Sequence, residues 1–155
     1  PTEVVIGTLR LVGDTDRVSP KTMDWCIDIT NMGQDLMNPP SVEGWHSGIE
    51  WINSGTLMKR TNFTAELISE YSRPGVVNIM NRVKSAGTAP EAVVDACLEV
   101  MGPLEIPAGA RQELIDHATS LGPIDWANES ASDGGAARVS ELIQLIVALR
   151  EYQFA

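Results

Sequence analysis

The sequence predicts an all-α fold, an irregular array of about seven helices joined by short connections rich in proline and glycine. Apolar residues recur at helical spacing along nearly the whole chain, and no stretch of useful length shows the apolar–polar alternation typical of a strand. Proline and glycine separate the apolar stretches, for example at Gly102-Pro103 and Gly122-Pro123. We therefore expect residues 1–155 to form a single helical domain.

Two helices are predicted before residue 40. The first has a short apolar stripe that stops at Gly13-Asp14 and consists of Val5, Thr8, Leu9 and Val12. We expect Ser19 to cap the second helix, with Pro20 in the first turn, where the lack of an amide proton costs nothing. The apolar face of the second helix consists of Trp25, Ile29, Met32 and Leu36.

Two further helices are predicted between residues 53 and 87. Asn53 or Ser54 is expected to cap a helix that runs from about Thr56 to Tyr71. Ser72-Arg73-Pro74 then ends this helix and starts the next, which ends near Gly87. The apolar residues of that next helix are Val76, Val77, Met80 and Val83.

The second half of the chain predicts three more helices. Thr88 and Glu91, with Pro90 between them, are expected to form a capping box. The stripe that follows is Val94, Cys97, Leu98 and Met101, and that of the next helix is Ala110, Leu114, Ala118 and Leu121. The last helix, at about 136–152, carries Val139, Leu142, Ile143, Ile146 and Leu149, widened by Leu145 and Val147. Such a wide stripe predicts a helix buried on more than one side.

The net charge of the chain limits the classes of molecule that we expect it to bind. The chain has 11 basic and 21 acidic residues, a formal net charge of −10, and its basic residues are scattered. Phosphate backbones need clustered Lys and Arg, so nucleic acid and anionic membranes are not expected as partners. No apolar run approaches the roughly 20 residues of a membrane span. The chain opens directly into helix-like sequence, without a visible signal peptide.

The cysteines do not indicate a metal site. Cys26 and Cys97 are far apart in the sequence and lack metal-ligand spacing. Cys97 lies on an apolar stripe, which favours a small buried hydrophobic residue. A disulfide between the two stays open, because its formation depends on geometry.

The most distinctive segment runs from Pro39 to Ile52. Pro39 and Pro40 restrict the backbone, whereas Gly44 and Gly48 permit angles that a Cβ would forbid. We expect an ordered loop held by large aromatic side chains.

Two interpretations of this loop stay open. In the structural one, Trp45 and Trp51 fill a gap between helices, and their neighbours Val42, Ile49 and Ile52 pack inward. In the other, exposed indoles form a platform for carbohydrate or a partner protein. The structural interpretation is favoured because the neighbours are apolar.

Catalytic and metal-binding patterns are weak. Glu43, His46 and Glu50 are weak candidates for a divalent metal, although His46 could equally hydrogen-bond within an ordered loop. Glu113 and His117 are spaced one helical turn apart, which a charged pair on a solvated face explains. The sequence contains no nucleophile elbow, phosphate loop or dinucleotide fingerprint, and we expect no cofactor.

The loop and the residues after it resemble the signature of a bacterial family, domain of unknown function 1800. The matching residues are Gly33-Gln34, Pro39-Pro40, Val42, Gly44-Trp45, Trp51-Ile52, Leu57, Arg60 and Asn62-Phe63. The likeness extends to Pro1–Val5 and to the terminal stretch from Leu142 to Gln153. Ser41 stands where Asn is usual, and His46-Ser47 where Pro-Gly is common.

The resemblance implies the C-terminal portion of a longer bacterial protein, exported to the periplasm or cell surface. The implied partners are the remainder of the parent chain and, as a further hypothesis, a sulfatase-like exported protein. The family has no established activity.

A non-catalytic helical module, structural or for interaction, is therefore the favoured hypothesis. The alternatives are part of an envelope hydrolase or metal-dependent enzyme with its site near Pro39–Ile52, and carbohydrate or surface binding through Trp45 and Trp51. The residues selected for a binding or structural role are Pro39, Pro40, Val42, Gly44, Trp45, Gly48, Trp51, Ile52, Arg60 and Asn62.

Overall fold

The computed structural model describes residues 1–13, 22–45, 50, 52–127 and 134–154. These residues form eight helices and no strand, which confirms the all-α prediction. The helices are α1 (Thr2–Leu11), α2 (Thr22–Asn31), α3 (Ser54–Ser69), α4 (Pro74–Ser85), α5 (Pro90–Met101), α6 (Ala108–Ser120), α7 (Gly135–Ala148) and α8 (Arg150–Gln153). None of the helices that the structure describes is long and apolar enough to cross a membrane.

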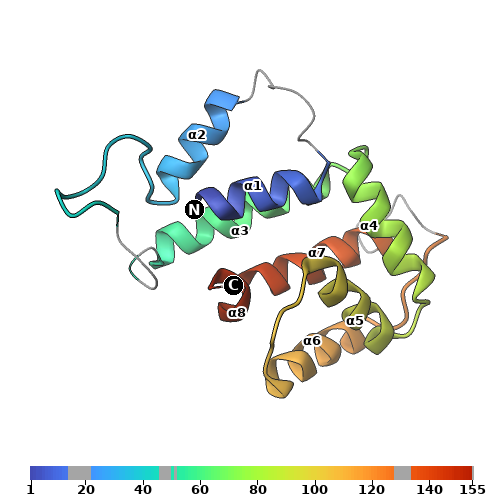
Figure 1. The fold of residues 1–155 in the computed structure, drawn as a ribbon. Helices are drawn as coiled ribbons and strands as arrows, with labels where there is room; N and C mark the ends of the chain where they lie inside the picture. Colours follow the sequence, from blue (N-terminus) through green and yellow to red (C-terminus); the bar gives the residue numbers. More distant parts are fainter. Residues whose placement is uncertain (14–21, 46–49, 51, 128–133, 155) are drawn as a thin grey trace.

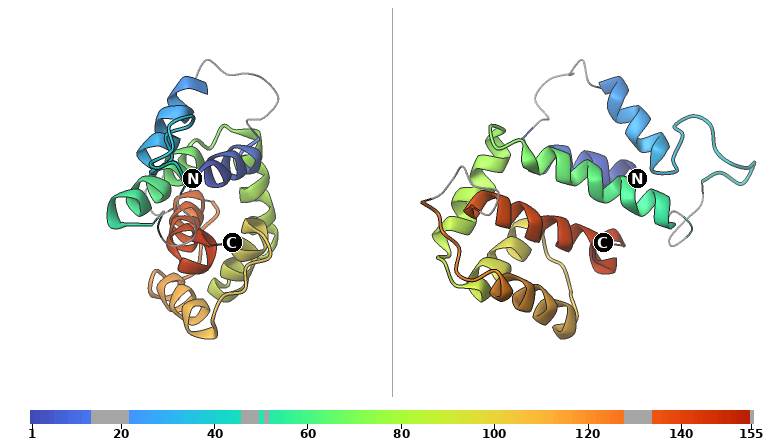
Figure 2. Two further views of the ribbon diagram at one scale, coloured as in Figure 1. Left: turned by 60° about the vertical axis from the view of Figure 1, so that its left-hand side comes forward. Right: turned by 180° about the vertical axis from the view of Figure 1, so that it is seen from behind.

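Helix α7 lies in the middle of the array (Figure 1). It packs against α3 on one side and against α4, α5 and α6 on the others. Helix α1 runs beside α3, and α2 packs on the outer side of these two helices (Figure 2). The prediction of a last helix buried on more than one side is therefore confirmed.

Part of the core consists of side chains that the helical periodicity had placed on one face, and Phe63, Leu67, Ile68, Ile79, Val93 and Ile124 complete it. On α1, Val5, Thr8, Leu9 and Val12 are all buried, as predicted. On α7, Val139, Leu142, Ile143, Ile146 and Val147 are buried, whereas Leu145 is 37% exposed. Burying aliphatic side chains of this size contributes about 1.5–3 kcal/mol each, so packing around α7 is a main source of stability.

The start of α3 follows the sequence-based prediction. The Asn53 side chain accepts a hydrogen bond from the Thr56 backbone amide at 3.0 Å, and the Asn53 amide donates to the Thr56 hydroxyl at 2.9 Å. This reciprocal capping box satisfies two amides that the first turn leaves without partners. Ser19 and Pro20, predicted to start α2, lie outside the described residues.

The predicted capping box at α5 is wrong. The N-cap of α5 is Ala89, no side chain caps it, and Pro90 is the first helical residue. Glu91 instead lies 3.5 Å from the Arg111 guanidinium of α6. Because the helix starts at Pro90, Glu91 is its second residue and not the third, which a capping box requires.

The single terminal helix predicted over 136–152 is also wrong. The backbone becomes extended at Leu149, with φ −64° and ψ 143°, so α7 ends at Ala148 and the short α8 follows. The Gln153 side chain donates to the Val147 carbonyl at 2.6 Å, which satisfies one of the last acceptors of α7. The break therefore folds the chain end back onto the helix that precedes it.

Three further residues of the predicted apolar stripes are exposed. Leu36 lies beyond the end of α2 and is 41% exposed, while Leu121 is the C-cap of α6 and is 50% exposed. Val77 is 43% exposed because its neighbours Val76 and Ile79 occupy the buried face of α4.

Both cysteines are free. Cys97 is fully buried and Cys26 is half-buried, so the two form no disulfide.

A glycine fixes the start of α7. A Cβ at Gly135 would stand 2.5 Å from Cε3 of Trp126. The Trp126 indole donates to the Gly87 carbonyl at 3.1 Å, which holds its ring in place. Gly135 is therefore required by the close approach of an indole ring.

Candidate interaction surface

Residues 35–45, called the arm below, project from the helical body between α2 and α3 (Figures 1 and 2). The base of the arm is tied to α1 by Gln34. The Gln34 side-chain oxygen accepts a hydrogen bond from the Thr2 amide at 3.1 Å and another from the Thr2 hydroxyl at 2.6 Å. The arm therefore starts from a fixed point on the body.

The arm has internal hydrogen bonds of its own. Asn38 donates to the Asp35 carboxylate at 2.9 Å. The Gly44 amide donates to the Ser41 carbonyl at 3.1 Å, which closes a tight turn, and Gly44 has φ +99°. Because L side chains rarely adopt that φ, Gly44 meets a backbone requirement of the turn. These contacts help to shape the described part of the arm.

The side chains of the arm are largely exposed. Pro39 and Pro40 are exposed, and Val42 is fully exposed at 106%, so the prediction that Val42 packs inward is wrong. Gly44, Trp45 and Ile52 are half-buried.

The other loop predictions lie outside the described residues. These concern Gly48, Ile49 and Trp51, which stay predictions for either the structural or the platform interpretation.

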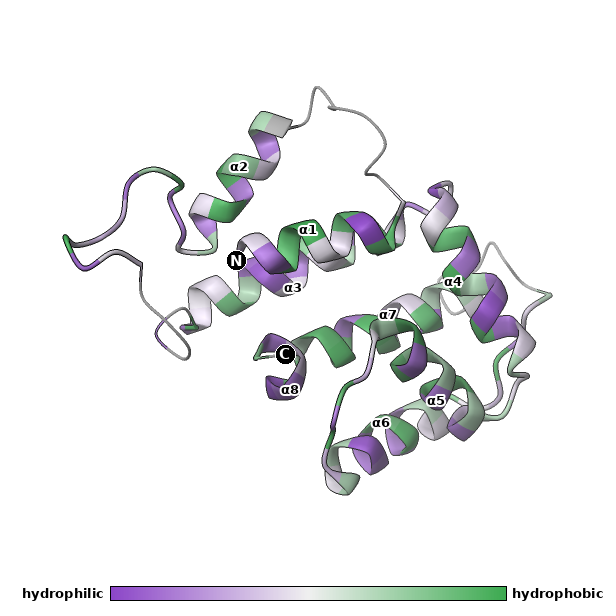
Figure 3. Ribbon diagram, viewed as in Figure 1, coloured by the Kyte–Doolittle hydropathy of each residue, from purple (hydrophilic) through white to green (hydrophobic). Residues whose placement is uncertain are grey.

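Large exposed hydrophobic side chains concentrate near the arm. The five most exposed ones of the described residues are Val42 (106%), Met37 (97%), Met23 (70%), Met58 (60%) and Ile27 (53%). On α2, Met23 and Ile27 are one turn apart, while Ile29 and Met32 of the same segment are buried. Figure 3 shows apolar residues along α2 and in the arm, away from the packed centre. Exposed apolar groups gathered in one region are typical of contact surfaces.

The same stretch of sequence contains no basic Lys or Arg residue of its own. Residues 22–58 contain no Lys or Arg, and their five acidic residues are Asp24, Asp28, Asp35, Glu43 and Glu50. Burial raises the pKa of Asp28, and the nearby Glu66 raises it further, against an opposing contribution from Lys59. The α2 and arm region is therefore both apolar and acidic.

The weak metal candidate is only partly described. Glu43 and Glu50 are exposed, and His46 lies outside the described residues. Within the described ranges, no three His, Cys, Asp or Glu side chains lie close enough to hold a metal ion together. A metal at Glu43, His46 and Glu50 thus stays a prediction.

His117 is paired across helices. Its Nε2 atom lies 3.2 Å from the Glu141 carboxylate of α7, so its partner is Glu141 rather than the predicted Glu113. Nearby, Arg111 of α6 makes a two-pronged contact with Asp95 of α5, at 2.8 and 2.7 Å. These surface contacts join neighbouring helices, and sequence spacing could not identify partners on other elements.

Arg60, selected from the family signature, is a buried cation. It is 3% exposed, and its Nη1 donates to the Gln153 side-chain oxygen at 3.1 Å. Its Nε is buried without a partner, and burial lowers its pKa. No carboxylate within the described ranges pairs with it, so Gln153 is its main compensation. Asn62, from the same signature, is exposed on α3.

Arg138, which no sequence pattern singled out, is buried on α7 at 8% exposure. Its guanidinium donates to three backbone carbonyls, those of Ala118 at 2.9 Å, Gly122 at 2.7 Å and Pro123 at 3.0 Å. These are acceptors at and after the end of α6, which the helix itself leaves unsatisfied. The signal in the sequence was an arginine one position before Val139, at the start of the wide apolar stripe of α7.

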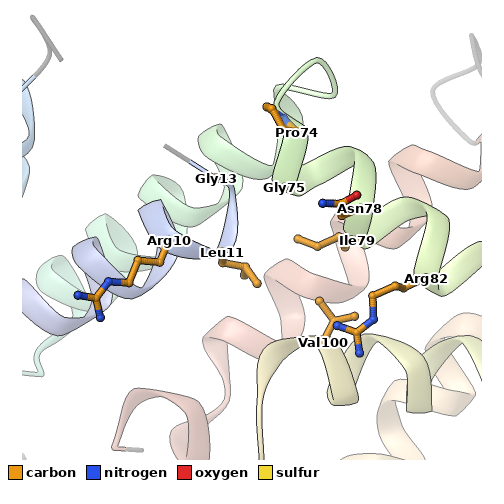
Figure 4. Close-up of a pocket in the computed structure, with 9 residues that line it drawn as sticks. All are labelled: Arg10, Leu11, Gly13, Pro74, Gly75, Asn78, Ile79, Arg82 and Val100. Carbon is orange, nitrogen blue, oxygen red and sulfur yellow. The ribbon is translucent and has the colours of Figure 1, made fainter. Parts of the chain in front are cut away.

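A pocket of about 380 Å³ lies between the end of α1 and the first turns of α4 (Figure 4). Its wall includes Leu11, Ile79 and Val100, and two arginines stand at its margins. Figure 4 shows the Arg10 guanidinium directed away from that of Arg82, and Arg82 is bonded to Glu99 at 3.2 Å. None of its nine described lining residues is a Ser, Cys, His, Asp or Glu. These residues provide no nucleophile or acid–base pair.

The chain matches a known protein family over nearly its whole length. Residues 1–154 match the model of a family described as a protein of unknown function, DUF1800. No curated protein and no solved structure matches the chain.

Proposed function

Because the chain belongs to the DUF1800 family, whose description assigns no activity, we propose from the geometry that it is a non-catalytic helical module. It docks a partner polypeptide through α2 and the arm. The remainder of a longer exported parent chain is the first candidate partner, and a sulfatase-like exported protein is the second.

The observation that carries the proposal is the exposure of large apolar side chains in this region. Met37 and Val42 are almost entirely solvated, and Met23 is 70% exposed. Covering a side chain of this kind stabilises a complex by about 1.5–3 kcal/mol before entropic costs. Methionine also adapts its shape to a partner, which suits a docking surface.

The attachment of the region to the body supports the same proposal. Ile29 and Met32 anchor the inner side of α2 in the core, and Gln34 ties the base of the arm to Thr2 of α1. A surface held in this way loses less conformational freedom on binding than a free peptide would.

Oxidation of methionine side chains tests the proposal without knowledge of the partner. The isolated chain and the protein purified with its native partners are treated with dilute peroxide, and sulfoxide is located by mass spectrometry. We expect Met23 and Met37 to oxidise readily in the isolated chain and at least about fivefold more slowly in the assembly. Met32, which is 1% exposed, is the internal control and should stay protected in both.

Two results would overturn the proposal. One is equal oxidation of Met37 in the isolated chain and in the assembly. The other is hydrolysis of an ester, sulfate or glycoside that is lost in Glu43→Gln or His46→Ala while the fold is kept, which would favour the enzymatic hypothesis.

A further inference from the structure

We infer that the segment docking on α2 and the arm is a basic, amphipathic stretch of polypeptide, with apolar anchors flanked by Lys or Arg. This inference rests on the proposed function and names the chemistry of the partner.

Carboxylates accompany the exposed hydrophobic side chains. Asp24 follows Met23, Asp28 follows Ile27, and Glu43 follows Val42. Asp35 precedes Met37 by two positions, and its carboxylate accepts from Asn38. A partner that covers Met23, Met37 or Val42 therefore meets a carboxylate within two positions of each of these side chains.

Two of these carboxylates have no ionic partner among the residues that the structure describes. Asp24 and Glu43 form no ion pair with any described residue, and the cation nearest in influence to Asp28 is Lys59 on α3. In the other half of the chain, several acidic side chains contact basic residues on neighbouring helices: Asp95 and Glu91 contact Arg111, Glu99 contacts Arg82, and Glu141 contacts His117. Among the described residues, the carboxylates of Asp24 and Glu43 thus have no ionic partner and directly follow the exposed Met23 and Val42 in the sequence.

The charge pattern selects among occupants. Phosphate groups of lipid or nucleic acid would be repelled by a region without Lys or Arg between residues 22 and 58. A second copy of the chain would bring the same acidic region against itself. A basic polypeptide gains complementary charge at the rim and apolar burial at the centre.

Two synthetic peptides test the inference directly. One is an 18-residue amphipathic helix of Leu and Lys, and the other has the same Leu pattern with Glu in place of Lys. Binding to the whole chain is measured by fluorescence anisotropy at low and high salt. We expect the Lys peptide to bind, with affinity at least about tenfold weaker at the higher salt concentration, and the Glu peptide not to bind.

Matched variants separate local charge from net charge. Asp24→Asn with Glu43→Gln removes two carboxylates from the region, and we expect about three- to tenfold weaker binding of the Lys peptide. Glu105→Gln with Glu113→Gln removes two exposed carboxylates elsewhere and should change binding less than about twofold.

The inference is overturned if the Glu peptide binds as well as the Lys peptide, if neither binds, if the two double variants behave alike, or if the chain self-associates through α2. Protection of Met37 in the native assembly decides the proposed function separately. If Met37 is protected but any of these results is obtained, the docking function stands and only the inference that the partner is basic is rejected.

Discussion

Arg60 on α3 donates to the side-chain oxygen of Gln153 on α8, across 3.1 Å, in the interior of the protein. Gln153 in turn donates to the Val147 carbonyl at 2.6 Å. The break at Leu149 allows this arrangement, because it turns α8 back toward α3. A neutral amide, rather than a carboxylate, therefore compensates a buried guanidinium.

Removing Gln153 should leave that charge without compensation. We expect Gln153→Leu to lower the free energy of unfolding by about 1.5–3 kcal/mol, since hydrogen bonds to charged groups contribute that much. Urea denaturation followed by circular dichroism measures the change. In the Gln153→Leu background, Arg60→Met should recover most of the loss, because the buried charge is then gone. Additive losses in the double variant would contradict this account of the pair.

Arg138 should be as important for stability as an apolar core residue. We expect Arg138→Met to lower the free energy of unfolding by about 2–4 kcal/mol, because three carbonyls around the end of α6 lose their donor. The exposed Arg10 provides the control, since Arg10→Met should change stability by less than about 0.5 kcal/mol. Similar thermal denaturation midpoints for the two variants would show that Arg138 does not cap α6.

The two helix glycines Gly135 and Gly109 should respond in opposite directions to alanine. Gly135→Ala places a methyl group against the Trp126 ring, and overpacking of this kind costs about 1–3 kcal/mol. Gly109→Ala in α6 meets no atom within 4 Å and should stabilise by up to about 1 kcal/mol. Chemical denaturation of both variants checks the pair, and a neutral Gly135→Ala would mean that α7 can shift away from Trp126.

Stability should fall in alkaline solution because of Cys97. Burial raises the pKa of its thiol to about 12, from an ordinary value of 9.0. Between these values the unfolded chain releases the thiol proton and the folded chain keeps it, so rising pH favours unfolding. One such group lowers the unfolding free energy by at most about 1.4 kcal/mol per pH unit in this window.

Urea midpoints measured from pH 8 to pH 10.5 test this prediction. Burial also raises the pKa of Tyr152, which adds a decline of the same sign. Cys97→Ala should give a shallower decline than the unaltered chain. An identical pH dependence in the two proteins would rule out the thiol as a cause.

Local sequence patterns were sufficient for much of the helical architecture. The stripe of α1 and the Asn53 cap of α3 follow from interactions within a few residues, and the structure shows both. Such features depend on backbone periodicity and on hydrogen bonds that close over one turn. The family signature likewise pointed to the arm and to Arg60.

Partners on separate elements were decided only by tertiary packing. Glu91 contacts Arg111 and does not cap α5. His117 contacts Glu141 of another helix, and Val42 is exposed to solvent. Which partner a side chain contacts depends on how helices that are far apart in the sequence pack against one another. The spacing of residues in the sequence does not contain that information. The sequence alone thus determined the helices and their apolar faces, whereas only the packed structure decided which charges meet, where the last helix breaks, and which apolar groups stay uncovered.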